Sequence, residues 1–396
     1  MQVDLNFYKD KKVLITGHTG FKGSWMCKVL LLAGAKVTGY SLEAPTNPSL
    51  YHLAGLEAKP CADLSAGSPL TPEDYWNTNC IYSVIGDIRD LAKLKKVFDE
   101  VQPEIVIHMA AQPIVRESYK DPVGTYETNV MGTVNVLECV RTVRSVRSFV
   151  NVTTDKVYLN KEWPWGYREN EELNGFDPYS NSKSCSELVT SSYKNSFFGG
   201  DSGIMPDGRR IAISTMRAGN VIGGGDFATD RIIPDCIRAV EEQKEIIVRN
   251  PYSTRPYQHV LEPVMAYLMV AEKQYKDITV AGNYNVGPDD VDCFSTGNIV
   301  DLFCECWNQD SNSKHEYVAS WKNVAEANAP HEANFLKLDC AKIKATFGWQ
   351  PVWNLHTVME KIVEWTRVYF AYKEKEELSE KIAACMEKQI KDYLKL

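Results

Sequence analysis

A glycine-rich turn between an apolar strand and an apolar helix constrains the fold of this chain more than any other feature. The strand is predicted at Val13–Ile15, the turn runs from Gly17 to Gly23, the helix is predicted over Ser24–Ala33, and a second strand follows at Lys36–Tyr40. Two strands joined by a covering helix lie parallel, with helices packed on the faces of their sheet. The opening of the sequence therefore predicts a βαβ unit.

The same alternation continues through the first half of the chain. Further strands are predicted at Tyr82–Ile85, Glu104–His108, Ser148–Val152 and Ile211–Ser214, and helices between them at Thr125–Val143 and Ser180–Phe197. Strands that alternate with helices are typical of a doubly wound parallel sheet. We therefore expect an α/β fold with a Rossmann-like, dinucleotide-binding domain over residues 1–221.

A smaller, mixed α/β domain for a substrate is predicted over residues 222–396, where turns rich in glycine, proline and arginine replace the alternation. Residues 259–276 are the exception, because the helical pattern at His259–Lys273 is predicted to return to the first domain. The polar segment Gly199–Gly208 is predicted as a loop. The Lys- and Glu-rich segment Tyr372–Lys381 is predicted as a solvated helix face.

Composition excludes several classes of function. The chain has 396 residues, enough for about two to three domains, and its net charge of −8 argues against binding to nucleic acid or acidic membranes. Eleven cysteines with no CxxC pair favour reduced thiols and no metal site. The apolar stretch Val29–Ala35 is too short to cross a bilayer. We expect a cytoplasmic protein with neither export signal nor membrane anchor.

The glycine turn is predicted to bind a dinucleotide. Glycines at 17, 20 and 23 allow a tight turn and let backbone N–H groups approach a pyrophosphate at the helix N-terminus, whereas the alternative is a tight turn without a ligand. The ribose is expected near Ser41, at the end of the second strand. NAD is preferred, although no carboxylate stands at this strand end and Glu43 comes slightly late, and NADP is the alternative if Lys22 holds a 2′-phosphate.

Tyr179 and Lys183 are the predicted catalytic pair. Four residues apart on a helix, they share one face. A free phenol has a pKa of about 10 and is a poor base at neutral pH, but a nearby ammonium and an oxidised nicotinamide ring both favour the phenolate. The pair follows the strand that ends in Thr153–Lys156, within the domain that carries the glycine turn. It is therefore predicted to remove a hydroxyl proton while hydride leaves the same carbon.

These residues carry a close family resemblance. The glycine turn resembles that of extended short-chain dehydrogenases, and four segments resemble nucleotide-sugar 4,6-dehydratases, in particular the branch that acts on CDP-glucose. The segments are Gly17–Trp25, Asp155-Lys156, Glu162–Asn170 and Arg249–Val260, and the resemblance runs from about Lys11 to Trp365. It implies a cofactor site built from Gly17, Thr19, Gly20, Phe21, Lys22, Gly23, Ser41, Asp87, Ile88, Ala110, Ala111, Gln112, Tyr179 and Lys183.

The resemblance also implies an internal redox cycle. Tyr179, supported by Lys183, removes the C4 hydroxyl proton as hydride passes to NAD, and Thr154 hydrogen-bonds the C4 oxygen. Asp155 protonates the departing C6 hydroxyl, and the same hydride returns to C6. Lys156 is the C5 base only if its pKa is depressed; otherwise Tyr179 serves twice and Lys156 stabilises the enolate or pairs with a carboxylate.

The resemblance implies that the substrate is a CDP-sugar. It also implies that the protein is a homodimer or a tetramer of dimers. Predicted substrate-binding residues are Arg217, Asn220, Arg249, Arg255 and His259, with the two late arginines suited to a diphosphate. Trp163, Trp165 and Tyr167 are predicted either to stack on the ligand or to anchor a loop. The rival functions are a nucleotide-sugar 4-epimerase or reductase, a dehydratase for another nucleotide sugar, and a non-catalytic redox-sensing protein. The Asp155-Lys156 pair argues against an epimerase. The presence of Tyr179 and Lys183 argues against a non-catalytic redox-sensing protein.

Overall fold

The fold is built on one parallel sheet of seven strands. A computed structural model describes residues 3–58, 70–309, 317–324 and 335–396. In it the strands lie in the order β10-β6-β5-β4-β1-β2-β3, and every neighbouring pair is parallel. The strands are β1 (Lys12–Thr16), β2 (Lys36–Ser41), β3 (Tyr82–Ile85), β4 (Ile105–His108), β5 (Ser148–Thr154), β6 (Ala212–Ala218) and β10 (Asn283–Val286). The predicted doubly wound sheet is confirmed.

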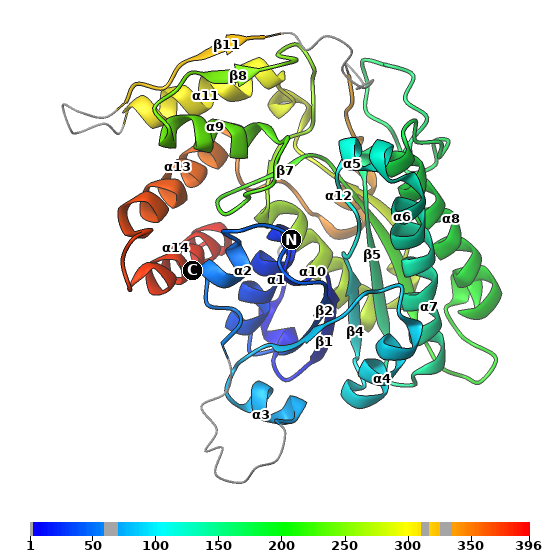
Figure 1. Cartoon of the computed structure of the whole chain (residues 1–396). Coiled ribbons are helices and arrows are strands. Elements are labelled where there is room, and N and C mark those ends of the chain that lie inside the picture. The colour runs from blue at the N-terminus through cyan, green and yellow to red at the C-terminus, as the bar shows by residue number, and fades with distance from the viewer. Residues whose placement is uncertain (1–2, 59–69, 310–316, 325–334) are drawn as a thin grey trace.

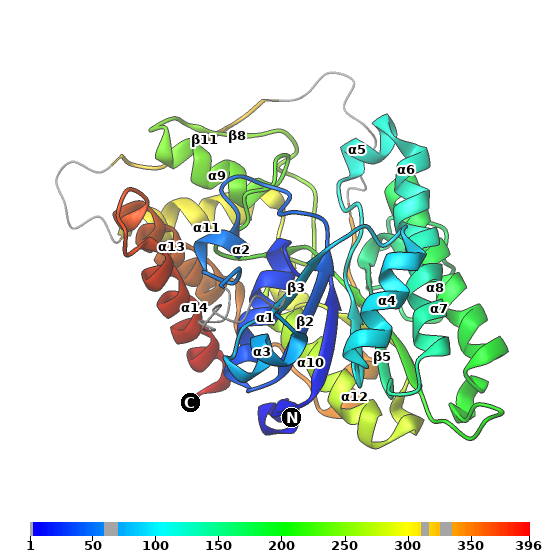
Figure 2. The same cartoon turned by 60° about the horizontal axis from the view of Figure 1, so that its bottom comes forward.

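Helices cover both faces of this sheet (Figures 1 and 2). On one face α1 (Phe21–Leu32) and α10 (Leu261–Lys276) share an apolar core with β1, β5 and β10. On the other face α4 (Leu91–Val101), α7 (Gly132–Thr142) and α8 (Pro178–Phe197) pack around a second core. The central strands are buried along both faces, and β1 and β4 accordingly contain apolar runs, whereas β5 and β6 also hold buried polar side chains.

A second lobe lies beyond the carboxyl ends of the strands (Figure 1). It contains α9 (Ile232–Glu241), β8 (Ile246–Val248), α11 (Thr296–Gln309), β11 (Trp321–Asn323) and α13 (Leu355–Tyr372), which share a separate apolar core. The remaining short elements are α2 (Leu50–Leu53), α3 (Pro72–Asn77), α5 (Val115–Lys120), α6 (Pro122–Tyr126), β7 (Val221–Ile222), β9 (Gln258–His259) and α12 (Ala341–Phe347). Strands β7 and β9 pair with each other where the chain passes between the lobes.

More of the second half returns to the sheet than the sequence predicts. Helix α10 packs on β5 and β6 as expected. Strand β10 also pairs with β6, although it lies within the 222–396 segment assigned to the second domain. Helix α14 (Leu378–Leu394) packs on α1 and α2, so its apolar side chains complete the first core. The short strand β10 escaped prediction because Asn283-Tyr284-Asn285-Val286 is half polar and lacks an apolar run.

Two predicted helices are interrupted. Thr125–Val143 is divided into α6, one π-helical segment over Glu127–Met131, and α7, and single π turns of this kind often occur at functional sites. The predicted solvated face at Tyr372–Lys381 is instead the turn between α13, which ends at Tyr372, and α14, which begins at Leu378. The charged residues of this segment thus mark a boundary between two helices.

A buried carboxylate fastens the C-terminal helix. Glu262 on α10 accepts backbone hydrogen bonds from Val352 and Trp353, each at 2.9 Å, and one from the Tyr393 hydroxyl on α14 at 2.7 Å. Burial raises the pKa of Glu262 to about 7. The neutral acid is thus favoured in the folded chain more than in the unfolded chain.

Stability should therefore fall as the pH rises through this range. Glu262 contributes stability that is fully present below its ordinary pKa of about 4.5 and is lost by about pH 7, a change on the order of 3 kcal/mol. Glu262→Gln keeps an acceptor and cannot ionise, so the wild-type and variant unfolding free energies should diverge between these pH values. Denaturant unfolding at pH 5 and pH 8 measures the difference. An equal pH dependence in both proteins would contradict the assignment.

Candidate active site

The glycine turn after β1 is so tight that two of its positions require glycine. Gly17 has φ +82°, and a Cβ there would lie 2.9 Å from the backbone nitrogen of Ala110. A Cβ on Gly23 would lie 2.1 Å from the carbonyl oxygen of Gly17. Gly20 is the N-cap of α1 and puts no side chain over its first N–H groups. The result is a backbone cradle at a helix N-terminus, which suits the phosphates of a dinucleotide.

The end of β2 presents hydroxyl groups beside this cradle. The Thr19 and Ser41 side-chain oxygens are 2.8 Å apart, and Thr19 also donates to the carbonyl of Leu42. His18 contacts the Ser41 hydroxyl and, by its other ring nitrogen, Ser83. Burial lowers the pKa of His18 to about 4, so its ring is neutral near pH 7. The surroundings of Ser41 are thus polar but carry no positive charge from His18.

The next two segments of the predicted cofactor site follow the ends of β3 and β4, which flank β1 and β2 in the sheet. The backbone carbonyl of Asp87, after β3, accepts from the Tyr40 hydroxyl, while its carboxylate is held by Arg89, which keeps the pKa of Asp87 low. Ile88 is buried directly under Gly132 on α7. After β4, Ala110 lies against the cradle, because its N–H donates to the Thr16 hydroxyl. Ala111 and Gln112 continue the same loop. Gln112 is fixed by Asn129 and Thr125.

A single cavity of about 1080 Å³ lies between the two lobes. It joins the carboxyl ends of β5 and β6 to α5, α9 and β8, and it brings together most of the residues predicted for catalysis and substrate binding. The predicted residues that line it are Phe21, Lys22, Thr154, Asp155, Lys156, Tyr179, Asn220, Arg249 and Arg255. In open parallel sheets a ligand typically binds in a crevice at this edge.

Tyr179 and Lys183 lie together at the start of α8. That helix begins after Asp177, which caps it by accepting from Ser180, with Pro178 in the first turn. Burial raises the pKa of Tyr179 to about 12, although the neighbouring Thr154 side chain opposes the shift. Burial lowers the pKa of Lys183 to about 8, and its ammonium donates to the Val152 carbonyl at 3.1 Å. The predicted pair is thus positioned in a dry environment.

A chain of hydrogen bonds runs along the end of β5. The Thr154 hydroxyl donates to Oδ1 of Asp155 at 2.9 Å, and Lys156 Nζ approaches the same oxygen at 3.4 Å. Lys156 also donates to the Asn220 side chain at 3.3 Å. Asp155 is 1% exposed, and its Oδ2 has no hydrogen-bond partner in the part of the chain that the structure describes. A buried oxygen without a partner is costly, so it is suited to a ligand hydroxyl.

Lys22 differs from its prediction. Its side chain lines the cavity beside Asp155, Lys183 and Arg231 and not the end of β2, where a 2′-phosphate is expected. Burial, together with the charges of Lys183 and Arg231, lowers the pKa of Lys22 to about 7.

Arginines gather at the second-lobe side of the cavity. Arg249 pairs with Asp230 at 2.9 Å and with Asp235 at 3.5 Å. Two further arginines were not singled out from the sequence: Arg231, paired with Asp226 at 3.0 Å, and Arg116 on α5, 3.9 Å from Asp230. The positions of these two arginines in the sequence do not reveal the cluster, because the residues come together only when both lobes are folded. The cluster provides several guanidinium groups for an anionic ligand.

Two predicted substrate contacts are wrong. Arg217 on β6 is 1% exposed and makes a bidentate pair with Glu187 on α8, at 3.0 and 2.9 Å, with a further bond to Tyr158. Its side chain points into the layer between sheet and helix because of that partner. His259 is fully buried between the rings of Trp25 and Trp353 and accepts from the Leu261 N–H at the start of α10. Both residues support the fold behind the cavity.

The tryptophan-rich loop is an anchor in this structure. Trp163 stacks on Tyr167, which stacks in turn on Tyr158, and Trp165 is exposed. The Tyr167 hydroxyl also accepts from the Lys161 N–H and donates to the side-chain oxygen of Asn160. The stacking of these rings on one another favours a role in anchoring the loop over a role in stacking on a ligand.

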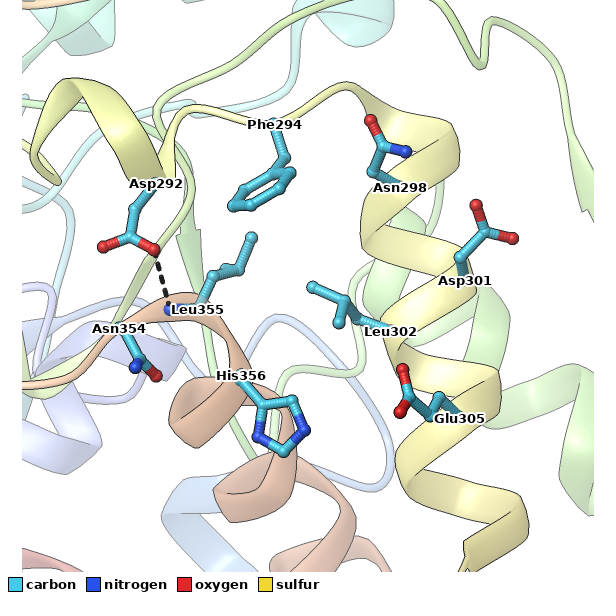
Figure 3. Close-up of a pocket in the computed structure, with 9 residues that line it drawn as sticks. All are labelled: Asp292, Phe294, Asn298, Asp301, Leu302, Glu305, Asn354, Leu355 and His356. Carbon is cyan, nitrogen blue, oxygen red and sulfur yellow. Dashed lines mark hydrogen bonds between the residues drawn. The ribbon is translucent and has the colours of Figure 1, made fainter.

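A smaller, separate hollow of about 310 Å³ lies between α11 and the start of α13 (Figure 3). Asp301 and Glu305 line it from α11, and His356 lines it from α13, while Asp292 accepts from the Leu355 N–H. Within the described residues no cluster with the makings of a metal site was found, here or elsewhere. The ten cysteines in the described segments are free thiols, whereas Cys61 lies outside them.

The chain matches known proteins along nearly its whole length. Residues 14–362 match the family model described as GDP-mannose 4,6 dehydratase. The chain is 44% identical over 393 residues to a protein of Salmonella typhimurium named CDP-glucose 4,6-dehydratase, covering 99% of this chain and 98% of that one. It is 25% identical over 294 residues to the dTDP-glucose 4,6-dehydratase of Haemophilus influenzae, covering 70% and 80% of the two chains.

Solved structures share the fold. A dTDP-glucose 4,6-dehydratase from Bacillus anthracis in complex with NAD superposes with a TM-score of 0.66 at 19% identity, covering 93% of this chain and 99% of that one. A UDP-glucose 4-epimerase from Stenotrophomonas maltophila with bound NAD gives a TM-score of 0.72 at 18% identity, covering 91% and 99%. Among the described residues, no helix has the length and apolar character that spanning a membrane requires.

Proposed function

Because the chain belongs to the GDP-mannose 4,6-dehydratase family, we propose that it is a nucleotide-sugar 4,6-dehydratase that converts CDP-glucose to CDP-4-keto-6-deoxyglucose. The observation that carries this proposal is the 44% identity to a CDP-glucose 4,6-dehydratase across almost the full length of both chains. The cavity supports it independently, because it combines Tyr179 with Asp155, a base and an acid for two different sugar oxygens.

The cradle fits NAD. The positions at Gly17 and Gly23 admit no side chain, and the uncapped start of α1 offers backbone N–H groups to a diphosphate. Ser41 and Asp87 would lie toward its adenosine half, and Tyr179 and Lys183 toward its nicotinamide half. When bound, the dinucleotide supplies a ring that accepts hydrogen from C4 of the sugar and returns it to C6.

The chain's own residues then move the protons. Tyr179 accepts the proton of the C4 hydroxyl, and Lys183 stabilises the phenolate by its charge. Thr154, which lines the same cavity, would hydrogen-bond the C4 oxygen. Asp155 donates a proton to the C6 hydroxyl as water leaves, and its Oδ2, which has no hydrogen-bond partner among the described residues, is the oxygen available for that contact.

Lys156 and the arginines complete the proposed site. Lys156, 3.4 Å from Asp155, either takes the C5 proton or stabilises the enolate by its charge. Arg249 and Arg255 would bind the substrate diphosphate, with Asn220 beside them. A 4-epimerase of the same fold needs no acid at C6, so the buried carboxyl of Asp155 favours the dehydratase.

A homodimer in the cytoplasm is proposed as the working form. Large apolar side chains are exposed along the side of the sheet formed by α5, α6 and α8. They are Tyr119, Val123, Met131, Phe176, Leu188 and Phe197. Large apolar side chains that are exposed and lie together mark protein interfaces. The free thiols fit a reducing compartment.

Turnover of a set of nucleotide sugars tests the proposed substrate. The purified protein with added NAD should convert CDP-glucose to a 4-keto product without any added reductant. It should process dTDP-, UDP- and GDP-sugars at least about tenfold less efficiently, the value of roughly 1.4 kcal/mol of lost binding. Product can be followed by chromatography and mass spectrometry. Preference for another nucleotide would overturn the CDP assignment and keep the dehydratase, whereas epimerised product without loss of water would overturn both.

A further inference from the structure

Asp230 pairs with two arginines that reach it from the two lobes of the molecule. Arg249 follows β8 in the second lobe, and its Nη1 donates to Oδ1 of Asp230 at 2.9 Å. Arg116 lies on α5, which packs on α8 of the first lobe, and its Nε is 3.9 Å from the same carboxylate oxygen. All three residues line the large cavity. One oxygen atom of Asp230 is thus shared by guanidinium groups from both lobes.

This arrangement matches the way in which arginines bind a phosphate group. Guanidinium groups bind carboxylate and phosphate oxygens through the same kind of charge-assisted hydrogen bond, so the two anions compete for one arginine. An oxygen that two arginines share stands where an oxygen of a diphosphate would bridge them. The Asp230 carboxylate therefore occupies a position that suits a phosphate of the ligand.

Asp230 is held more weakly than its neighbour Asp226. The Asp226 side chain is 5% exposed, and it accepts from the Ala228 N–H in its own loop as well as pairing with Arg231. The Asp230 side chain is 36% exposed, and among the described residues its carboxylate accepts a hydrogen bond from Arg249 alone. A partly exposed ion pair stabilises a fold little. A ligand with more negative charge can therefore displace the Asp230 carboxylate.

We propose that Asp230 is an internal competitor of the substrate diphosphate, which displaces its carboxylate from Arg249 and Arg116. This role rests on the proposed function, which supplies the nucleoside diphosphate. The ligand carries a negative charge on each phosphate group, whereas Asp230 carries one charge in all, so the exchange favours the ligand. The carboxylate lowers the affinity of the arginines for the diphosphate. Because the product carries the same diphosphate, the returning carboxylate also speeds its release.

Asp230→Asn removes the charge and changes little else. The side chain keeps its shape, and asparagine tolerates the left-handed backbone of this position, where φ is 59°, as well as aspartate does. Isothermal titration calorimetry of the full-length protein, loaded with NAD, measures the binding of CDP, inorganic pyrophosphate and cytidine. CDP and pyrophosphate should bind the variant about three- to tenfold more tightly, the value of one or two partly exposed ion pairs. Cytidine, which has no phosphate, should bind both proteins equally.

Two further variants and one rate complete the test. Arg249→Met should weaken CDP binding by about tenfold or more, as expected for a charged group that binds phosphate. Asp207→Asn alters a partly exposed pair with Arg209 outside the cavity, and it should leave CDP affinity within about twofold of the wild type. In stopped-flow displacement, CDP should leave Asp230→Asn more slowly than it leaves the wild type.

Several results would overturn the competition. Weaker CDP binding in Asp230→Asn would mean that the carboxylate positions the arginines, and unchanged binding would mean that the diphosphate does not meet Asp230. A gain for cytidine as large as the gain for CDP would show that the change does not act through phosphate. An unchanged dissociation rate would contradict the role in release. The proposed function fails separately, if the wild type binds CDP but forms no dehydrated product from CDP-glucose.

Discussion

Asp155→Asn should lower the rate of dehydration by about 10²- to 10⁴-fold, the usual contribution of a general acid. The substitution is nearly isosteric, and the amide can still accept the 2.9 Å hydrogen bond from Thr154 at its oxygen. It cannot supply a proton to the C6 hydroxyl at neutral pH. Steady-state turnover of CDP-glucose measures the loss, and an unchanged far-UV circular dichroism spectrum shows that the fold is retained.

A matched control is available on the surface. Asp301 on α11 lines the smaller hollow of Figure 3 and accepts from the Trp321 indole, far from the proposed chemistry. Asp301→Asn makes the same chemical change and should leave turnover within about twofold, since single surface substitutions rarely have larger effects. Near-normal turnover in Asp155→Asn would remove this residue from the mechanism and leave Lys156 as the nearest alternative acid.

Glu187→Gln should destabilise the protein by about 3–5 kcal/mol, because it leaves a buried guanidinium without its counter-charge. The Glu187 carboxylate accepts from both sides of Arg217, at 3.0 and 2.9 Å, and from the hydroxyls of Thr153 and Thr215. The pair joins α8, which carries Tyr179 and Lys183, to β5 and β6. Chemical denaturation of the wild type and the variant measures the difference in unfolding free energy.

The double variant Glu187→Gln with Arg217→Met checks the cause. Removing both charges eliminates the unpaired cation, so the double variant should be more stable than Glu187→Gln alone. Glu138→Gln, which breaks the partly exposed pair with Arg141 on α7, is the control and should cost no more than about 1 kcal/mol. A single variant as stable as the wild type would mean that water reaches Arg217.

The sequence predicts the features that depend on neighbours along the chain. The glycines at 17, 20 and 23 lie between a strand and a helix, so the cradle follows from local order alone, and the four-residue spacing places Tyr179 and Lys183 on one face of α8. Likewise, the buried strands β1 and β4 contain apolar runs. Each of these signals is contained within a few turns or one strand.

Features that depend on distant partners were missed or misassigned. Arg217 lies near the end of β6, but its partner Glu187 lies 30 residues earlier, and their pairing becomes visible only when α8 packs on β6. His259 precedes a helix that returns to the sheet, so it lies behind Trp25 and not in the cavity. The contact between Arg116 and Asp230 likewise exists only because α5 faces the second lobe. Side-chain direction, which spacing does not encode, decides all three.

The central claim is that the hydrogen removed from C4 returns to C6 of the same sugar within one active site. The direct measurement uses CDP-glucose deuterated at C4, incubated with the protein and NAD in unlabelled water, with the product analysed by NMR and mass spectrometry. The account predicts deuterium at C6, hydrogen from water at C5, and no requirement for added reductant. Deuterium lost to the solvent or found only in free NADH, or product that forms only when a reductant is supplied, would contradict it.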